Sequence, residues 1–144
     1  MLHNIRLAAE LAAPRNEIYS MYVDAKKHAT VTGAPARIAP RASAAFSAFD
    51  STLTGRILHV VPGELIVQTW RSSNFKPSDA DSILILTLLP QGRGNTLLDL
   101  QHLNVPEHDY AGISQGWELY YFAPWREYLA KRSGKRASKP AKMG

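Results

Sequence analysis

The sequence feature that most constrains the fold is an aromatic-rich stretch near the C-terminus, from Pro106 to Lys131. Its large side chains recur at steps of three or four, the spacing that places them on one stripe of a helix. The stripe consists of Tyr110, Ile113, Trp117, Tyr120, Pro124 and Tyr128, and it is widened by Tyr121, Trp125 and Leu129. At ~1.5 Å per residue, about 25 helical residues span roughly 37 Å, enough to cross a small sheet. We therefore predict one long C-terminal helix that closes one core.

The start of this helix and two weak points within it are also visible in the sequence. Pro106 suits a first helical position, and Glu107 and Asp109 place negative charge near the positive end of the helix dipole. Pro124 predicts a kink in the helix, because proline removes a backbone hydrogen-bond donor. The helix is not expected to end there, because the stripe resumes at Tyr128. Gly116 is the second weak point, where we expect a strand to approach closely.

Upstream of the helix, the pattern is that of one strand, two short helices and then a series of strands. The first strand is predicted at residues 3–11, the helices at residues 15–23 and 25–32, and Asp24 as the cap of the second helix. Period-two alternation then predicts strands at residues 36–39, 44–49, 51–60, 64–71, 82–89 and 96–103. This order indicates an α+β fold in which a curved antiparallel sheet surrounds the long helix.

Two of the predicted strands carry polar residues on the face that we assign to the interior. In the strand predicted at residues 64–71, one face carries Ile66, Gln68 and Trp70. In the last predicted strand, residues 96–103, the matching face carries Thr96, Leu98, Leu100 and His102. We assign these faces to the core because the opposite faces carry Arg71 and Asp99. Burying a charged side chain costs free energy, so these two residues are most stable in contact with water. The predicted core is thus richer in hydrogen-bonding groups than an oily core requires.

The positive charge of the chain is concentrated at its end. Of the formal charge of +5, residues 131–144 alone contribute +6, from six Lys or Arg and no acid, which leaves residues 1–130 at −1. We predict a single domain over residues 1–130 and a basic, disordered tail over residues 131–144. No aromatic residue is interleaved with these charges, so we expect no nucleic-acid partner.

The absence of cysteine limits both chemistry and location. With no Cys among 144 residues, disulfides, thiolate metal sites and cysteine nucleophiles are excluded, which fits a reducing cytoplasm. Near the N-terminus the longest apolar run, residues 7–13, is broken by Glu10, and no run approaches the ~20 residues of a membrane span. We therefore expect a cytoplasmic protein with no secretory signal and no membrane span.

A series of short motifs, taken in order, resembles a known family. The motifs are Leu11-Ala12-Ala13-Pro14, His28 to Gly33, Phe46 to Asp50, Gly55-Arg56, Ile66 to Arg71, Asp81-Ser82, His102 with Val105-Pro106, and Gly116-Trp117 with Tyr120-Tyr121. Their order and spacing resemble the bacterial single-domain members of the family named for activators of heat-shock protein 90 ATPase, in the START-like (SRPBCC) superfamily. The resemblance implies a helix-grip (Bet v-like) fold with a cavity between sheet and helix. It also implies a stress-response or co-chaperone-like role.

The chain departs from the family pattern at three positions. Ala44, Ala45 and Ser51 stand where relatives usually have glycine. Because such positions often need positive φ, we expect the bend or bulge there to be altered and the cavity mouth to be narrowed.

Seven residues form the candidate ligand site. They are Phe46, Gln68, Trp70, His102, Trp117, Tyr120 and Tyr121. In the first hypothesis the aromatic rings hold a small apolar or aromatic ligand, and Gln68 and His102 fix its polar end. The alternative is that the aromatic residues fill the core and that Gln68 and His102 satisfy each other or a buried water.

Two other classes of function remain open. A co-chaperone would bind its partner through the sheet, the loop of residues 74–81 or the basic tail. A cyclase- or hydrolase-like enzyme would use His102 as general acid or base, assisted by Asp81, Tyr120 or Arg71. No nucleophile elbow, phosphate loop or paired-carboxylate motif supports catalysis, so we predict a non-enzymatic protein without a cofactor, monomeric or homodimeric.

The remaining polar residues give weaker signals. The five histidines show no ligand spacing, so no metal site is expected. Arg56 and Arg71 lie on neighbouring strands and could hold an anion. We favour surface ion pairs with Glu64, Asp81 or Asp99 instead.

Overall fold

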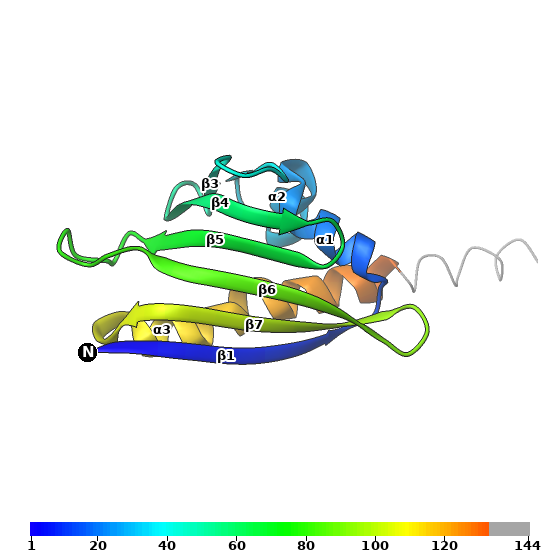
Figure 1. The fold of residues 1–144 in the computed structure, drawn as a ribbon. Coiled ribbons are helices and arrows are strands. Elements are labelled where there is room, and N and C mark those ends of the chain that lie inside the picture. Colours follow the sequence, from blue (N-terminus) through cyan, green and yellow to red (C-terminus); the bar gives the residue numbers. More distant parts are fainter. Residues whose placement is uncertain (133–144) are drawn as a thin grey trace, which may run out of the picture.

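Alternation of buried and half-buried residues along the middle of the chain produces one antiparallel sheet. The computed structural model describes residues 1–132, in which seven strands lie in the order β1-β7-β6-β5-β4-β3-β2 (Figure 1). The strands are β1 Leu2–Leu11, β2 Ala36–Arg37, β3 Ala45–Ala48, β4 Leu53–Val61, β5 Leu65–Ser72, β6 Ser82–Gln91 and β7 Asn95–Pro106. Six of these correspond closely to predicted strands, whereas the strand predicted at residues 36–39 is reduced to two residues.

Two short helices follow β1, as predicted. α1 spans Arg15–Val23 and α2 spans Ala25–Thr32. The side chain of Asp24 caps α2 by accepting a hydrogen bond from the backbone N–H of Lys27 at 3.0 Å. Gly33 ends α2 in the left-handed region, with φ of 80°. α1 packs against β6 and α2 against β2, so both helices cover the inner face of the sheet.

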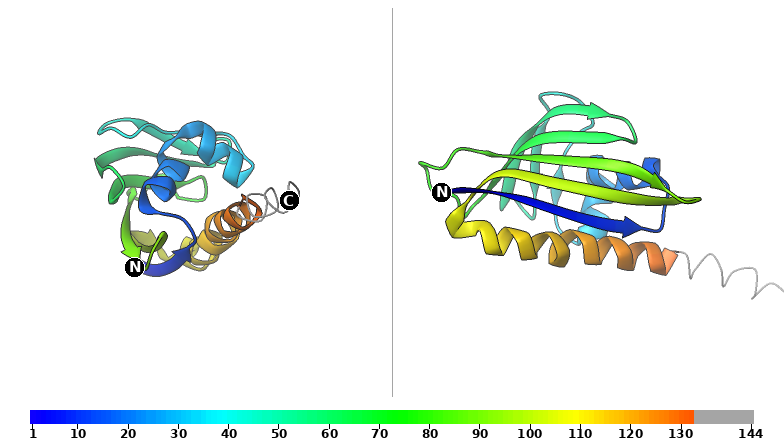
Figure 2. Two further views of the ribbon diagram at one scale, coloured as in Figure 1. Left: turned by 90° about the vertical axis from the view of Figure 1, so that its right-hand side faces the viewer. Right: turned by 60° about the horizontal axis from the view of Figure 1, so that its bottom comes forward.

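The long C-terminal helix is present and lies in the curve of the sheet. It consists of α3 (Glu107–Trp117), a π-helical turn η1 (Glu118–Phe122) and a further helical segment over residues 123–132. Figure 2 shows it running along β1 and β7 beneath the curled sheet. This arrangement confirms the predicted helix-grip fold.

The turn η1 changes which residues of the helix face the core. The predicted kink at Pro124 takes the form of this wide turn, in which the N–H of Ala123 bonds to the carbonyl of Glu118. The buried stripe is Ile113, Trp117, Tyr121, Trp125 and Leu129, in successive steps of four. In a regular α-helix each such step overshoots a full turn by ~40°. The extra residue held in the π-helical turn offsets this drift.

Part of the predicted stripe is therefore wrong. Tyr110 and Tyr120 are 38% and 57% exposed, and Pro124 and Tyr128 are only half-buried. Tyr121, which the periodicity placed at the margin, occupies the centre instead. For Tyr120, Pro124 and Tyr128 the reason is the phase shift at η1, which a regular 3.6-residue repeat does not contain, whereas Tyr110 lies before that turn.

The predicted inner faces of the strands are confirmed. Ile66, Gln68 and Trp70 are at most 4% exposed, and His102 is fully buried. The core lies between this face, α1 and the C-terminal helix, and its largest wholly buried side chains are Trp125, Tyr22, Leu11, Ile18, Met21, Ile57, Ile66, Leu84, Leu86, Leu88, Leu98 and Leu100.

The three positions that depart from the family pattern behave differently from one another. Ala44 and Ala45 do not adopt positive φ, and β3 pairs with β4 without a register shift, so no bulge forms there. Ser51 has φ of 67° and follows Phe49 and Asp50, which also lie in the left-handed region. The strain falls on this turn between β3 and β4.

Glycine permits close approach of strands at Gly55 and not at Gly116. A Cβ at Gly55 would overlap the backbone carbonyl of Thr69 on β5. Beside Gly116 only the ring of Tyr120 lies within 4 Å. The expected strand contact at Gly116 is therefore wrong.

The predicted tail falls mostly outside the described residues. Lys131 and Arg132, assigned to it, continue the helix instead, and both make ion pairs: Lys131 with Glu127 at 3.0 Å and Arg132 with Glu17 on α1. Residues 133–144 lie outside the part of the chain that the structure describes. None of the helices within residues 1–132 is long and apolar enough to cross a membrane.

Candidate functional site

A cavity of about 480 Å³ opens between α3 and the end of the sheet at which β4 begins and β5 ends. Aromatic rings form much of its wall, and a few small polar side chains complete it. Its lining residues are Phe49, Thr52, Leu53, Trp70, Ser72, Asn74, Asp109, Gly112, Ile113, Gly116, Trp117, Tyr120 and Tyr121. The volume falls in the ~300–1,000 Å³ range of small-molecule sites.

Two glycines form the helical wall of the cavity. Gly112 and Gly116 lie four residues apart on α3 and therefore on one face of the helix. Neither has positive φ. A Cβ would lie 3.4 Å from the Asp109 carboxylate at Gly112 and 3.5 Å from the Tyr120 ring at Gly116, both ordinary van der Waals distances. The packing of the fold therefore does not require glycine at either position.

Tyrosine and phenylalanine rings frame the mouth of the cavity. Phe49 belongs to the strained turn between β3 and β4, and its ring centroid lies 5.6 Å from those of both Tyr120 and Tyr121. Tyr120 is more than half exposed, while Tyr121 is buried. The turn thus brings an aromatic ring across to the helix at the edge of the opening.

The seven residues of the candidate ligand site divide into two groups. Trp70, Trp117, Tyr120 and Tyr121 line the cavity. Phe46, Gln68 and His102 do not; they lie deeper in the core and are at most 2% exposed. The structure therefore brings four of the seven residues to one opening.

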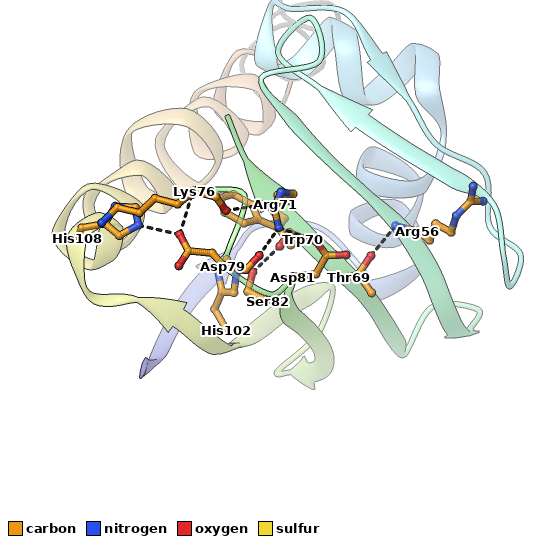
Figure 3. A network of polar contacts seen from close by, with 10 residues as sticks. All are labelled: Arg56, Thr69, Trp70, Arg71, Lys76, Asp79, Asp81, Ser82, His102 and His108. Atoms are coloured by element: carbon orange, nitrogen blue, oxygen red, sulfur yellow. Dashed lines mark hydrogen bonds and ion pairs between the residues drawn. The ribbon is translucent and has the colours of Figure 1, made fainter. Parts of the chain in front are cut away.

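His102 belongs to a closed chain of hydrogen bonds. Ser82 donates to the carbonyl of Trp70 at 2.6 Å and lies 2.8 Å from Nε2 of His102 (Figure 3). Because the Ser82 proton is engaged, Nε2 of His102 carries a proton and donates it, while Nδ1 accepts from the indole N–H of Trp117 at 3.2 Å. Burial lowers the pKa of His102 from 6.5 to about 3. This histidine is neutral and fully partnered at neutral pH.

A second buried network surrounds Gln68. Tyr22 on α1 donates to the side-chain oxygen of Gln68 at 2.5 Å, and the side-chain N–H of Gln68 donates to the carbonyl of Thr69. Burial, with a smaller effect of nearby Tyr121, raises the pKa of Tyr22 well above its usual value. Gln68 and His102 therefore have separate protein partners. They do not bond each other, which was one of the two arrangements in the alternative hypothesis.

His28 is a buried polar residue that was not among the predicted site residues. Its Nδ1 donates to the carbonyl of Tyr22 at 2.7 Å, and its Nε2 accepts from the hydroxyl of Tyr121 at 3.0 Å. Burial lowers the pKa of His28, and the bond to the carbonyl partly opposes this shift. Burial also raises the pKa of Tyr121. The signal available was its place in the motif of residues 28–33, whose role a single sequence does not reveal.

The loop after β5 is tied down by Arg71. Its guanidinium donates to the carbonyls of Lys76 and Asp79 at 2.7 Å and pairs with Asp81 at 3.1 Å (Figure 3). Asp79 accepts from the backbone N–H of Lys76 and contacts His108 of α3 at 2.9 Å; the His108 contact and the Lys76 bond lower its pKa. The Asp81 pair confirms one of the ion pairs that we favoured over an anion site.

The other predicted groups do not assemble around His102. Arg56 donates to the carbonyl of Ser43, while Arg6 pairs with Asp99 and Arg15 with Glu64. The side-chain partners of His102 are Ser82 and Trp117, and not the proposed assistants Asp81, Tyr120 or Arg71. Within residues 1–132, no group of three or more His, Asp or Glu is placed to hold a metal ion.

Asp109 is a further cavity residue that the sequence reading assigned to another role. It lies in the first turn of α3, where helix polarity favours a negative charge, and it also lines the cavity. Its Oδ2 atom is buried and has no hydrogen-bond partner among the described residues. The pair Gly112 and Gly116 was a usable signal, because two glycines within an aromatic helical stripe weaken the helix at one face.

The architecture and the cavity define the class to which the protein belongs. A curved antiparallel sheet, two short helices after its first strand, and a long C-terminal helix lying in its curve make a helix-grip protein. The chain belongs to the family of activator of Hsp90 ATPase homolog 1-like proteins, whose family model matches residues 12–130.

Individual relatives agree with this family. An uncharacterized protein of Schizosaccharomyces pombe is 32% identical over 112 residues, which are 78% of this chain and 33% of that protein. The human activator of 90 kDa heat shock protein ATPase homolog 1 is 26% identical over 106 residues, or 74% of this chain and 31% of the human protein. The chain thus spans about one third of the length of these relatives.

A solved structure shows the same fold. The crystal structure of an HSP90 activator from Plasmodium falciparum superposes with a TM-score of 0.80 at 18% sequence identity. The match covers 88% of this chain and 96% of that chain. The similarity therefore extends over almost the whole domain.

Proposed function

We propose that this protein is a non-enzymatic helix-grip protein that binds a small apolar or aromatic molecule in the cavity between α3 and the sheet. The observation that carries the proposal is the pair of glycines on the cavity wall. Each glycine in a helix interior costs ~1 kcal/mol relative to alanine. Space exists for a methyl group at both positions, so the fold would gain from alanine. Keeping the cavity open is the benefit that offsets this cost.

The chemistry of the wall supports an aromatic occupant. Trp70, Trp117, Tyr120 and Tyr121 present ring faces and edges to the space, and Phe49 lies across its mouth. Aromatic side chains pack against flat apolar molecules in offset or edge-to-face geometry, with a gain beyond area burial. Thr52, Ser72 and Asn74 add the few polar groups that orient a ligand in sites of this kind.

The environment of His102 supports binding over catalysis. A general base needs a free lone pair within reach of substrate. Both ring nitrogens of His102 are engaged inside the core, and the residue has no exposed surface. Ser82 donates its proton to a backbone carbonyl and not to the histidine, so the pair does not form an activated nucleophile.

Tryptophan fluorescence and thermal melting against a panel of aromatic compounds test the proposal. Trp70 and Trp117 line the cavity, so an occupant will change the emission and raise the melting temperature with a saturable dependence on concentration. Gly116→Ala narrows the cavity and will weaken the effect, whereas Gln115→Ala, on the exposed side of α3, will preserve it. Equal affinity of the two variants for every hit would contradict binding at this site.

A second candidate function is that of a co-chaperone-like module in stress response, which family membership favours. The structural feature that fits it is the outer face of the sheet, which α1, α2 and α3 leave uncovered (Figures 1 and 2). Val67 and Ile85 pair on this face, and Ile83 pairs there with Leu103; all four are half-buried. Apolar residues grouped on an open face are typical of interaction surfaces.

Titration calorimetry and ATPase assays with an Hsp90-type chaperone test this second function. Ile85→Lys places a charge in the middle of the open face and will abolish binding if that face is used. Gln115→Lys, at an exposed position of α3 away from this face, is the control that adds the same charge elsewhere. Binding that survives in Ile85→Lys would exclude the face, and binding that is lost without residues 133–144 would assign the contact to that segment.

A further inference from the structure

The charge of the cavity wall selects among possible ligands. Of the thirteen lining residues, Asp109 is the one with an acidic side chain, and none is Lys, Arg or His. Arg71 is next in sequence to the lining residues Trp70 and Ser72, but strand alternation turns it to the other face. There it is held by two backbone carbonyls and Asp81. An anionic ligand would therefore meet a carboxylate and no cation.

The Asp109 carboxylate also lacks a partner of its own. Oδ2 is buried without a hydrogen-bond partner among residues 1–132. The adjacent His108 projects from a different side of α3, where its Nε2 contacts Asp79 at 2.9 Å. A buried acceptor left without a donor is costly, and a ligand that brings an N–H or O–H group would relieve the cost.

We propose that the cavity takes a flat aromatic molecule that carries a protonated amine or a neutral hydrogen-bond donor, and that it rejects aromatic and aliphatic carboxylates. Asp109 is the residue that sets this preference. The inference rests on the proposed ligand-binding function and specifies its ligand class. The aromatic wall holds the ring system, and the first turn of α3 presents the carboxylate to the donor.

Three probes that share one ring system separate ligand class from binding itself: naphthylmethylamine, naphthalenemethanol and naphthoate. Titration calorimetry with the whole chain will give the tightest binding for the amine, weaker binding for the alcohol and the weakest for the carboxylate. For a charge pair near 4 Å in a partly screened site, we expect the amine and the carboxylate to differ by at least ~10-fold. Raised salt will narrow this difference.

Asp109→Asn removes the charge and keeps the shape. This substitution will lower the affinity for the amine by ~5- to 10-fold and raise the affinity for the carboxylate. The affinity for the alcohol will stay nearly unchanged. Glu107→Gln is the matched control, because Glu107 lies in the same first turn but is exposed, contacts His3 and does not line the cavity. It will leave the order of the three probes unchanged, and melting curves will show that both variants are folded.

The outcomes distinguish this inference from the function on which it rests. Binding of all three probes with equal affinity, weakened by Gly116→Ala, would keep the ligand site and overturn the ligand class. A uniform loss of all three probes in Asp109→Asn would assign the residue a structural role and also overturn the class. No binding of any probe would remove the ligand-binding function and this inference together.

Discussion

The inner side of the sheet holds two polar regions of opposite character. The side chains of His102 and Gln68 both find partners: Ser82 and Trp117 bond the histidine, and Tyr22 bonds the glutamine. At the cavity, about two helical turns before Trp117 on α3, the Oδ2 atom of Asp109 has none. His102 and Gln68 are buried and bonded, while the Asp109 carboxylate lies at an opening with one oxygen atom unpartnered.

The difference shows which polar residues belong to stability and which are available for binding. Trp117 lies at the border, because its indole N–H bonds His102 on one side and its ring lines the cavity on the other. A satisfied buried network fixes a unique core. An unsatisfied group beside an opening is where a ligand adds a bond that the protein does not make for itself.

Acid is expected to have the largest effect on the closed region. The pKa of His102 is about 3 in the folded protein and ~6.5 in the unfolded chain, so between these values the unfolded state binds the extra proton. Stability is then complete above pH ~6.5, falls as the pH is lowered, and loses up to ~5 kcal/mol by pH 3. Lowering of the pKa of His28 adds to the loss in the same direction.

Urea unfolding between pH 7 and pH 4 measures this dependence. His102→Gln removes the titrating group, so its stability will be lower at pH 7 but will change less with pH. A wild-type stability that stays constant from pH 7 to pH 4 would contradict a buried neutral His102.

Removal of the border residue is expected to have the next largest effect. Trp117→Ala deletes a buried indole and leaves Nδ1 of His102 without its donor, at a cost of ~3–5 kcal/mol. Trp117→Phe keeps most of the volume and will cost less. Chemical denaturation measures both, and a loss below ~1 kcal/mol for the alanine variant would contradict the central role of this helix face.

A pair of tyrosine variants compares the two regions directly. Tyr22→Phe leaves the buried oxygen of Gln68 without its donor, and we expect a loss of ~1–3 kcal/mol. Tyr120→Phe removes a hydroxyl from a half-exposed ring at the cavity mouth and will change stability by less than ~0.5 kcal/mol. Thermal melts that rank the two variants in the opposite order would show that the closed region is not the more tightly specified one.

The smallest expected effect is a gain. Gly112→Ala and Gly116→Ala replace helix glycines where a methyl group meets ordinary van der Waals distances, so each will raise stability by up to ~1 kcal/mol. Calorimetric melting measures the gain. A loss in both variants would mean that the glycines serve packing, and it would remove the observation on which the ligand site rests.

The elements of the fold could be predicted because their signals are local. Alternation around Trp70 and His102 gave the inner faces of β5 and β7, and the cap at Asp24 gave the start of α2. The phase of the C-terminal helix could not be predicted from periodicity alone. Pro124 predicted an irregularity in the helix. Whether the irregularity is a kink or a wide turn depends on how the sheet packs against the helix.

The candidate site was only partly predictable, for a related reason. Trp70 and Trp117 reach the cavity, but His102 and Gln68 face the same side of the sheet and lie too deep to reach it. Alternation tells which face a residue occupies and not how far along a curved sheet the packed core extends. Asp109 was missed because helix polarity already explained an acid in the first turn.

The π-helical turn divides the C-terminal helix into two segments with separate duties. The segment before it, Glu107–Trp117, forms the cavity wall, whereas the residues after it complete the core and tie the chain to α1 through Arg132 and Glu17. The wide turn holds both segments in phase with the sheet, although their spacings would otherwise drift apart. Substitutions in the first segment can therefore reshape the cavity wall and leave the contact of the second segment with α1 in place.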